Sequence, residues 1–312
     1  MRKLAAGFLP FALVGLLGLS STGCIKKILL DGQIASTRKG STAFNTVSDW
    51  EIAYKAASAG IAQMEGMHYL GPYNQDALLM LTRSWSGLAF GFIEDEMEQA
   101  QDQYGEDAEM VAYHRQRAVA AYSRAIFYGG KLLEMRNPGF EEARKNAETM
   151  QAWLREFDEP EEDIENLFWF AQAWLSRVNL LKDKPEYVAE LYVGVEIMKR
   201  ALELDPTWNY GTIHGVMGAY HARTAMAELD QAKEHFDKAI EISEGRSLLV
   251  KVNYAAKFYC AKVDKENYVR LLQEVLDAGD PLPEQRLQNT IAKRRAKRLL
   301  APWRMEICGF PS

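Results

Sequence analysis

The sequence predicts an all-α protein in which antiparallel helix pairs of the tetratricopeptide-repeat (TPR) type stack into a curved helical array. After Ser48 the apolar residues recur at helical spacing, and no convincing strand pattern occurs. Short turns containing Gly, Pro and Asp separate these segments, and short turns place successive helices antiparallel. A triplet of small, bulky and small residues also recurs at about the period of one or two TPR units.

The start of the chain has the features of a bacterial lipoprotein signal peptide over residues 1–23. Arg2 and Lys3 precede an apolar run that ends at Leu19, too early for the roughly 20 residues that a membrane-spanning helix needs. Small residues then lead to Cys24, a pattern that resembles the lipobox at which lipoproteins are cleaved and diacylated, although Ser21 stands where Leu is usual. We expect Cys24 to become the acylated first residue, which gives a stable two-chain anchor. An ordinary secretory signal that leaves Cys24 free is the alternative.

Residues 24–44 are rich in basic and small residues and predict a tether to a helical domain over residues 45–312. If flexible, a tether of about 20 residues would hold this domain about 25 Å from the membrane. Its basic residues either lie on anionic headgroups or are simply solvated. Ile25, and not Asp, follows the cysteine and favours the outer membrane, so we expect a lipid-anchored chain on the periplasmic side.

Helix signals divide the domain into consecutive segments. Ser48 and Glu51 form a capping box, Asn74 is a candidate N-cap, and Gly129-Gly130 weakens the helix in which it lies. The expected helices span residues 48–64, 75–104, 106–135, 141–157, 161–181, 185–204, 207–227, 229–244, 247–261, 265–277 and 284–300.

The second helix of a TPR unit carries two small residues, with a bulky residue between them, where it approaches its neighbour closely. Ala232, Phe236 and Ala239 satisfy this pattern fully. One such triplet occurs by chance in many amphipathic helices, but four copies predict stacked pairs with a concave binding face. The other copies are Ala118-Tyr122-Ala125, Gly194-Met198-Ala201 and the bulkier Tyr268-Leu272-Val275.

Charge and cysteine content narrow the classes of partner. The chain has a formal net charge of −6, and cleavage before Cys24 removes two basic residues and no acid. The mature chain is therefore mildly acidic, which argues against nucleic acid as a partner. Cys260 and Cys308 could pair in an oxidising compartment, although a buried free thiol is the simpler expectation for Cys260 in its apolar helix. The sequence leaves their pairing open.

No constellation of residues predicts an enzyme. The five histidines form no paired metal motif, and His214 and His221, two turns apart on one helix face, are expected to be structural. The mature chain has no Gly-x-Ser-x-Gly elbow, no phosphate-binding glycine loop and no outstanding carboxylate pair. We therefore expect no catalytic residue, no metal and no cofactor.

Aromatic residues are better candidates for binding a ligand or partner. Tyr128 lies near the end of one helix, and Trp169 and Trp174 belong to an aromatic-rich helix whose rings point in several directions. His214 and Tyr220 lie on a glycine-containing helix that a ligand or another backbone could approach closely. For Tyr128, Trp169 and Trp174, the simpler expectation is that these side chains fill space between long helices.

Two charged features complete the candidate binding residues. Arg246 follows Gly245 at the start of a helix, a position suited to an anion, and a salt bridge is the alternative. A basic run over residues 293–298 lies near the end of the last helix, where the helix dipole favours cations. We expect this run to form a solvated face, with contact to an acidic partner as the alternative.

Longer motifs are recognisable along the chain. They are Arg136-Asn137-Pro138-Gly139-Phe140, Leu167-Phe168-Trp169, Ala201-Leu202-Glu203-Leu204-Asp205-Pro206, Glu234-His235-Phe236-Asp237-Lys238-Ala239, Ser243-Glu244-Gly245-Arg246-Ser247, Arg286-Leu287-Gln288-Asn289 and Lys293-Arg294-Arg295-Ala296. Together, and in this order from about residue 45 to 301, they resemble the T-component family of TRAP (tripartite ATP-independent periplasmic) transporters. The sequence departs from the family at Lys293, where Gln is common, and at Thr207-Trp208-Asn209, where an acidic residue is more usual.

The resemblance implies a helical, TPR-like lipoprotein that associates with the substrate-binding P-component of a TRAP transporter and forms a homotrimer. We expect a transport accessory that captures or shields a small ligand, or docks the P-component, before uptake across the inner membrane. The alternative is a general TPR scaffold that assembles envelope proteins and has no ligand of its own. Genes for a P-component and TRAP membrane subunits beside this one would favour the first function.

Overall fold

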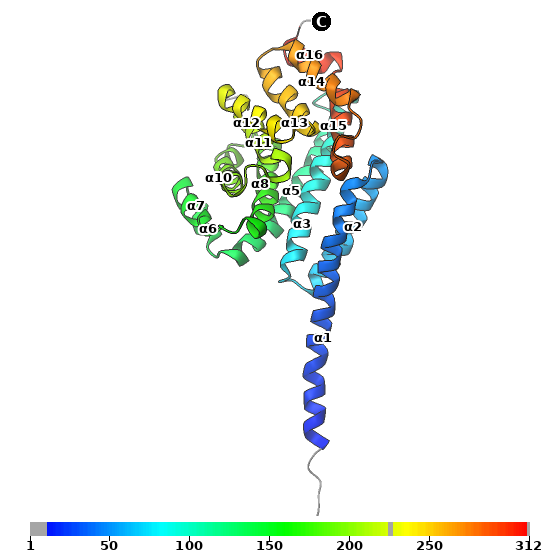
Figure 1. Cartoon of the computed structure of the whole chain (residues 1–312), viewed down its shortest axis with the longest axis vertical. Helices are drawn as coiled ribbons and strands as arrows, with labels where there is room; N and C mark the ends of the chain where they lie inside the picture. Colours follow the sequence, from blue (N-terminus) through cyan, green and yellow to red (C-terminus); the bar gives the residue numbers. More distant parts are fainter. Residues whose placement is uncertain (1–10, 224–226, 311–312) are drawn as a thin grey trace, which may run out of the picture.

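The computed structural model describes residues 11–223 and 227–310, with the backbone alone for residues 11–24. Helices pack into an array. One long helix, α1, projects from one end of the body, and α16 lies at the opposite end (Figure 1). The described residues contain no strand, which confirms the predicted all-α array. Among the same residues, none of the helices combines the length and the apolar character needed to cross a membrane.

Residues 24–44, for which the sequence predicts a tether, lie in helix α1 (Phe11–Gly40) and the 3₁₀ helix η1 (Ser41–Thr46). The side chain of Ile34 is completely buried in an apolar cluster formed with α2, α3 and α5. Arg38 forms ion pairs with Asp76 and Glu165. These contacts order the second half of α1 against the body. They stabilise the packed segment more than hydration of its small and basic side chains would stabilise a free one.

The signal-peptide features lie at the edge of the described chain. Arg2, Lys3 and the first residues of the apolar run fall outside the described residues, as does the side chain of Cys24. Cleavage at Cys24 and the boundaries at residues 23 and 44 therefore remain predictions.

The body consists of helices joined by short turns, most of them close to the predicted ranges. The helices expected over residues 141–157 and 185–204 are each divided by a turn, and α16 is an addition to the prediction. The helix expected over residues 207–227 ends earlier, and residues 224–226 lie outside the described part. In chain order the elements are α2 (Trp50–Leu70), α3 (Gln75–Leu88), η2 (Ala89–Ile93), α4 (Glu94–Tyr104), α5 (Glu109–Arg136), α6 (Phe140–Ala143), α7 (Ala147–Leu154), α8 (Pro160–Leu180), α9 (Pro185–Val188), α10 (Leu191–Leu204), α11 (Trp208–His221), α12 (Leu229–Ile242), α13 (Leu248–Asn253), η3 (Tyr254–Tyr259), α14 (Lys265–Asp277), η4 (Pro283–Gln285), α15 (Arg286–Leu299) and α16 (Pro302–Ile307).

Helix starts follow the capping chemistry of the sequence with one correction. The predicted capping box at Ser48 is wrong by one residue, because Asp49 is the N-cap of α2 and accepts a hydrogen bond from the Ile52 N–H at 2.8 Å. Asn74 caps α3 as predicted, and its side chain accepts from the Ala77 N–H at 2.9 Å. Local side-chain acceptors of this kind satisfy backbone N–H groups that the first turn of a helix leaves unpaired.

Consecutive helices pack as antiparallel neighbours, and the four predicted triplets lie in their contacts. Helix α3 packs on α5, α5 on α8, α8 on α10, and α11 on α12. All residues of the triplets are buried. Ala239 packs where α12 meets α11, with its Cα 3.2 Å from an ideal Cβ built on Gly211. The small residues therefore serve the close approach that the pattern predicts, and Gly129, inside α5, does the same against Phe170 of α8.

Two π-helical turns, η2 and η3, interrupt otherwise α-helical segments. η2 joins α3 to α4 in one continuous helix, and η3 extends α13. Single π-turns of this kind widen a helix locally and are frequent at functional sites. They lie beside the cluster of charged residues described below.

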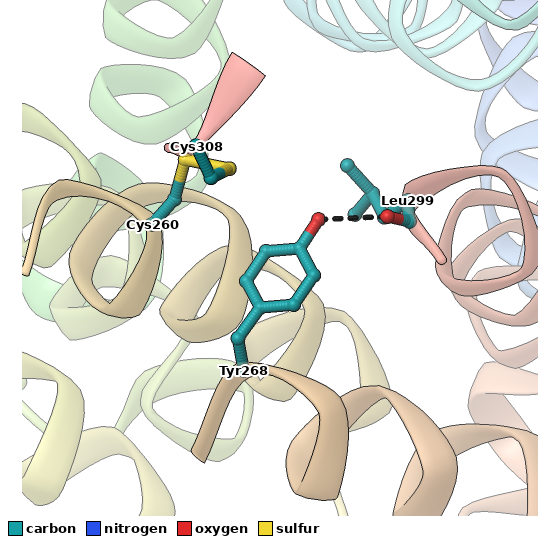
Figure 2. Close-up of a disulfide and its surroundings, with 4 residues drawn as sticks. All are labelled: Cys260, Tyr268, Leu299 and Cys308. Carbon is teal, nitrogen blue, oxygen red and sulfur yellow. Dashed lines mark hydrogen bonds between the residues drawn. A yellow bond between two sulfur atoms is a disulfide. The ribbon is translucent and has the colours of Figure 1, made fainter. Parts of the chain in front are cut away.

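A disulfide between Cys260 and Cys308 fastens the C-terminal segment to the body (Figure 2). The expectation of a free, buried thiol at Cys260 is therefore wrong. Tyr268 of α14 lies beside the disulfide, and its hydroxyl donates a hydrogen bond to the Leu299 carbonyl oxygen at 2.9 Å. Together these bonds hold α14, α15 and α16 as one end of the molecule, opposite α1 (Figure 1).

Candidate functional site

Four charged residues and one tyrosine, from four helical segments, lie near one another next to the two π-turns. We call this group the central cluster and define it as Glu94 and Glu98 of α4, Tyr122 of α5, Lys257 of η3 and Arg295 of α15. Ionised groups are rarely enclosed in a protein unless they are paired, bind a ligand or perform chemistry. The geometry of each member therefore shows which of these explanations applies.

Arg295 lies at the centre of the cluster and is almost completely buried. Its guanidinium lies 3.7 Å from both the Glu94 and the Glu98 carboxylates. Burial alone would lower the pKa of Arg295, but the charges of Glu98 and Glu94 outweigh it and raise the pKa. The Nε atom of Arg295 is buried and has no hydrogen-bond partner among the described residues. Arg295 thus stays charged with one donor unused.

Glu94 and Tyr122 form a second contact of the cluster. The Tyr122 hydroxyl donates a hydrogen bond to Glu94, and burial together with this carboxylate raises the pKa of Tyr122 well above its usual value. Burial also raises the pKa of Glu94, despite the opposing charge of Arg295. Glu94 is therefore easier to protonate than a carboxyl group in water, and it accepts or donates hydrogen bonds according to its protonation state.

Lys257 is the member without a protein partner. It forms no hydrogen bond or ion pair with any residue that the structure describes, although it lies in the electric field of Glu98 and Glu94. Its side chain is exposed to water, yet burial among protein atoms lowers the pKa of its ammonium group. An ammonium group in this setting is available to an anionic group of a ligand.

Two polar residues of α8 extend the same environment. Ser176 interacts with the Tyr122 hydroxyl, which offsets a small part of the rise in the pKa of Tyr122, and it accepts a hydrogen bond from Gln172 Nε2 at 3.2 Å. Gln172 Oε1 is buried and has no hydrogen-bond partner among the described residues. An unpaired buried acceptor costs about 1–3 kcal/mol, so a bound molecule or water that donates to it would be stabilised.

A ring of stronger ion pairs surrounds the cluster and ties α4 to α15. Asp95 is fully buried and lies 2.7 Å from Arg294 and 2.5 Å from Arg298. Burial alone would raise the pKa of Asp95, but Arg294 and Arg298 hold it below the usual value. The prediction that the basic run 293–298 forms a solvated face is therefore wrong for all three arginines of the run, Arg294, Arg295 and Arg298. They face acids of the same chain because α15 packs inside the array, and within the run only Lys297 is exposed.

The arrangement suits non-covalent binding of a small polar molecule. It offers two cations, two carboxyl groups, an amide and hydroxyls, and three of these groups have unused hydrogen-bonding capacity. Among the described residues, no group of three or more His, Cys, Asp or Glu side chains has the geometry to hold a metal ion. A hollow of about 310 Å³ lies elsewhere in the structure, beside Arg38 and Arg83.

Tyr128 and Trp169, two predicted binding residues, border one apolar cluster and form part of the core. Tyr128 is buried, donates a hydrogen bond to Glu65 and lies 5.0 Å below the Arg124 guanidinium. Burial and Glu65 raise the pKa of Tyr128 to about 12. Trp169 is half-buried, with Arg83 5.9 Å from its ring. The space-filling alternative describes Tyr128 better than a ligand contact does.

Trp174 is also a core residue. Only 2% of its surface is exposed, and its Nε1 atom donates to the Glu190 carbonyl oxygen at 3.0 Å. The Arg177 guanidinium lies 5.0 Å from its ring, and burial lowers the pKa of Arg177. Trp174 therefore joins α8 to α10 and does not contact the central cluster through any interaction that the structure describes.

His214 belongs to a cluster of three histidines that the sequence does not reveal. His214 Nδ1 lies 2.9 Å from His235 Nδ1, and the His221 ring stacks on His235 with 5.4 Å between centroids. His221 in turn lies 2.7 Å from Glu228. Burial, with smaller contributions from the other two histidines, lowers the pKa of His235 to about 4. The cluster joins α11 to α12.

Tyr220 and Arg246 make local contacts. Tyr220 is half-buried, and the Arg223 guanidinium lies 3.9 Å from its ring. Arg246 pairs with Glu244 at 3.3 Å and lies 5.9 Å from the Tyr210 ring. The salt-bridge alternative for Arg246 is thus present, and the predicted binding residues as a whole do not converge on one site.

The sequence analysis assigned no member of the central cluster to a common ligand site. A signal exists for Arg295, because it lies four residues after Ile291 and four before Leu299, on the apolar face of an amphipathic helix. Glu94 and Glu98 are likewise four residues apart, directly after the apolar run that ends at Ile93. Lys257 carries no comparable signal, because its position depends on the π-turn η3.

A comparison with known proteins gives the chain its family. The family model of the TRAP transporter T-component matches residues 46–305, which is most of the chain. No curated protein matches it. The matched region contains the whole central cluster and all helices from α2 to α15. The chain therefore belongs to the TRAP transporter T-component family.

Proposed function

We propose that this protein is a lipid-anchored accessory subunit of a TRAP-type solute uptake system that binds the P-component and holds a small polar ligand at the central cluster. The family membership supports the accessory role in a TRAP transporter. The observation that carries the ligand is Lys257, whose ammonium group has no hydrogen-bond or ion-pair partner among the described residues and lies in the electric field of Glu98 and Glu94. The proposed role is binding and not catalysis.

The anchor is proposed at Cys24, with the body on the periplasmic side of the membrane and the outer membrane favoured. The pattern of a short apolar run, small residues and a cysteine supports it. Replacement of Cys24 by Ala should release the protein from the membrane fraction or leave the precursor uncleaved. A variant that is still processed and stays with membranes in alkaline carbonate, which removes proteins held by surface contacts alone, would rule out acylation at Cys24.

Association with the P-component is tested with the mature chain, residues 24–312, carrying Cys24→Ser to avoid acylation. This chain is mixed with the P-component encoded in the same genome and followed by sedimentation velocity, which also reports whether the chain alone is a homotrimer. A transient interface should be populated at about 100 μM of each protein. Absence of a complex, also after addition of cell extract as a ligand source, would favour the general TPR scaffold.

Ligand binding is tested by incubating the same chain with a metabolite extract of the bacterium and identifying the retained molecules by mass spectrometry. We expect a retained molecule with an anionic group, lost in Lys257→Met and kept in Lys257→Arg. The matched control is Lys297→Met, an exposed lysine of α15 outside the cluster. Equal retention by the Lys257→Met and Lys297→Met variants would remove the central cluster as the ligand site.

A further inference from the structure

Apolar side chains are exposed at the end of the body from which α1 projects. The five large hydrophobic side chains with the greatest exposure in the described residues all lie at this end, and the next in order, Ile307, is 62% exposed. They are Tyr69 (85%), Tyr73 (81%), Leu70 (71%), Ile28 (69%) and Leu29 (67%). Such a concentration of exposed apolar surface marks an interaction site. We call these five residues the basal patch.

The basal patch is formed by the turn between α2 and α3 and by the part of α1 that lies next to this turn. The turn between α2 and α3 contributes the two tyrosines and Leu70, and it lies against α1, because Asn74 donates a hydrogen bond to Asp31 at 2.7 Å. An ideal Cβ on Gly71 would also lie only 3.1 Å from the Leu30 side chain. The α1 residues of the patch, Ile28 and Leu29, lie less than one helical turn before this contact.

The distance from this part of α1 to the proposed anchor matches the thickness of a lipid headgroup layer. Cys24 precedes Leu30 by six residues in α1, which corresponds to about 9 Å of helix at 1.5 Å per residue. The headgroup region on each side of a bilayer core is about 5–8 Å thick. Acyl chains on Cys24 would therefore bring the patch to the membrane surface when α1 stands upright, as it does relative to the body in Figure 1.

The chemistry of the patch matches the same surface. Tyrosine is enriched at membrane interfaces because its ring is apolar and its hydroxyl prefers water. Lys26 and Lys27 add two cations next to the patch, whereas the nearby carboxylate of Asp31 already accepts the hydrogen bond from Asn74. Basic residues at this position are attracted to anionic headgroups.

We propose that the basal patch is a membrane-docking surface that seats the body on an anionic lipid bilayer. The patch fixes the orientation of the array, so that α14 to α16 face away from the membrane. The inference rests on the anchor proposed at Cys24, which supplies the proximity, but the lipid contacts are made by different residues. Docking converts a tethered body into one of defined height and orientation towards its partners.

The experiment places a spin label in the mature, acylated protein reconstituted into vesicles of phosphatidylethanolamine and phosphatidylglycerol. Cys260 and Cys308 are bonded and Cys24 is acylated, so the new cysteine in Tyr73→Cys is the one free thiol. We expect vesicles to lower its collision rate with a charged nickel chelate about five-fold, because charged groups are excluded from the apolar layer. The control is Tyr104→Cys at the end of α4, whose neighbour Asp102 contacts Arg304 near the C-terminus.

A second arm uses the unacylated Cys24→Ser chain and vesicle sedimentation, so that it does not depend on the anchor. The triple variant Tyr69→Ser/Leu70→Ser/Tyr73→Ser should partition into these vesicles about ten-fold less than its parent. A label at position 73 that stays accessible on vesicles carrying the anchored protein would overturn docking and leave the anchor intact. A label at position 73 whose collision rate falls with rising protein concentration, and not on addition of vesicles, would show that the patch contacts a second copy of the protein instead. A first-arm protein that dissociates from the vesicles as readily as the unacylated Cys24→Ser chain would remove the anchor and keep the patch.

Discussion

Arg295 donates a hydrogen bond to the carbonyl oxygen of Phe90 at 2.9 Å, and its guanidinium carbon lies 4.1 Å from the centroid of the Phe90 ring. The two residues are 205 positions apart in the chain, and Phe90 lies in the π-turn η2. The contact therefore joins the last long helix to the first part of the array. It also holds Arg295 in place between Glu94 and Glu98, so the central cluster depends on it.

Replacement of Arg295 by Met should destabilise the fold by about 3–5 kcal/mol, because it leaves buried carboxylates without their cation. The double variant Arg295→Met/Glu94→Gln should recover part of this loss. Denaturant unfolding measures both, and Lys297→Met, an exposed change in the same helix, should lie within about 0.5 kcal/mol of the wild type. Similar stabilities for the Arg295 and Lys297 variants would show that the cluster is solvated and contributes little.

The contrast between Lys297 and Arg295 also marks the limit of the sequence analysis. Periodicity, turn residues and the small-bulky-small triplets predicted the helices and their antiparallel packing, because these properties depend on neighbours in sequence. Asn74 was predicted as a cap for the same reason. Which face of α15 is buried depends on α4, about 200 residues away, so the basic run was assigned to solvent.

The candidate site was the least predictable part of the molecule. Tyr128 and Trp174 were chosen as aromatic residues, but buried aromatic residues fill a core more often than they bind ligands, and both do so here. Lys257 was overlooked, because an unpaired lysine is recognisable only when its surroundings are known. The order of α1 was also unforeseen, because it rests on contacts with distant parts of the chain, namely the burial of Ile34 and the ion pairs of Arg38 with Asp76 and Glu165.

Gly218 tests the close approach of α11 and α12. A Cβ at this position would lie 2.8 Å from the Phe236 ring, so Gly218→Ala should overpack the contact by about 1–3 kcal/mol. Gly60 of α2 is the matched control, because it is exposed and a Cβ there meets nothing within 4 Å. Gly60→Ala should be neutral or raise the melting temperature, since Ala favours the helix by about 1 kcal/mol. Equal melting temperatures for the two variants would contradict the packing.

The disulfide should stabilise the C-terminal end of the array. Cys260 and Cys308 are 48 residues apart, and closing a loop of this length stabilises a protein by about 3–4 kcal/mol in the chain-entropy description. Cys308→Ser and the double variant with Cys260→Ser should therefore lower the melting temperature by the same amount. Added reductant should lower the melting temperature of the wild type and leave that of both variants unchanged. A wild type that is insensitive to reductant would argue against the bond.

The histidine cluster gives the protein a pH dependence whose sign follows from the pKa of His235. Burial and the neighbouring histidines lower this pKa to about 4 in the folded protein, against about 6.5 in the unfolded chain. The resulting stability is fully present above pH 6.5 and is lost as pH falls, because protons then bind the unfolded chain in preference. Between pH 7 and 5, the shifted pKa of His235 should lower the free energy of unfolding by about 1–2 kcal/mol.

In His235→Gln this part of the loss should disappear, whereas Gln231→Ala, an exposed change on α12, should keep the wild-type slope. Parallel pH profiles for the wild type and His235→Gln would mean that His235 takes up its proton as readily in the folded protein as in the unfolded chain.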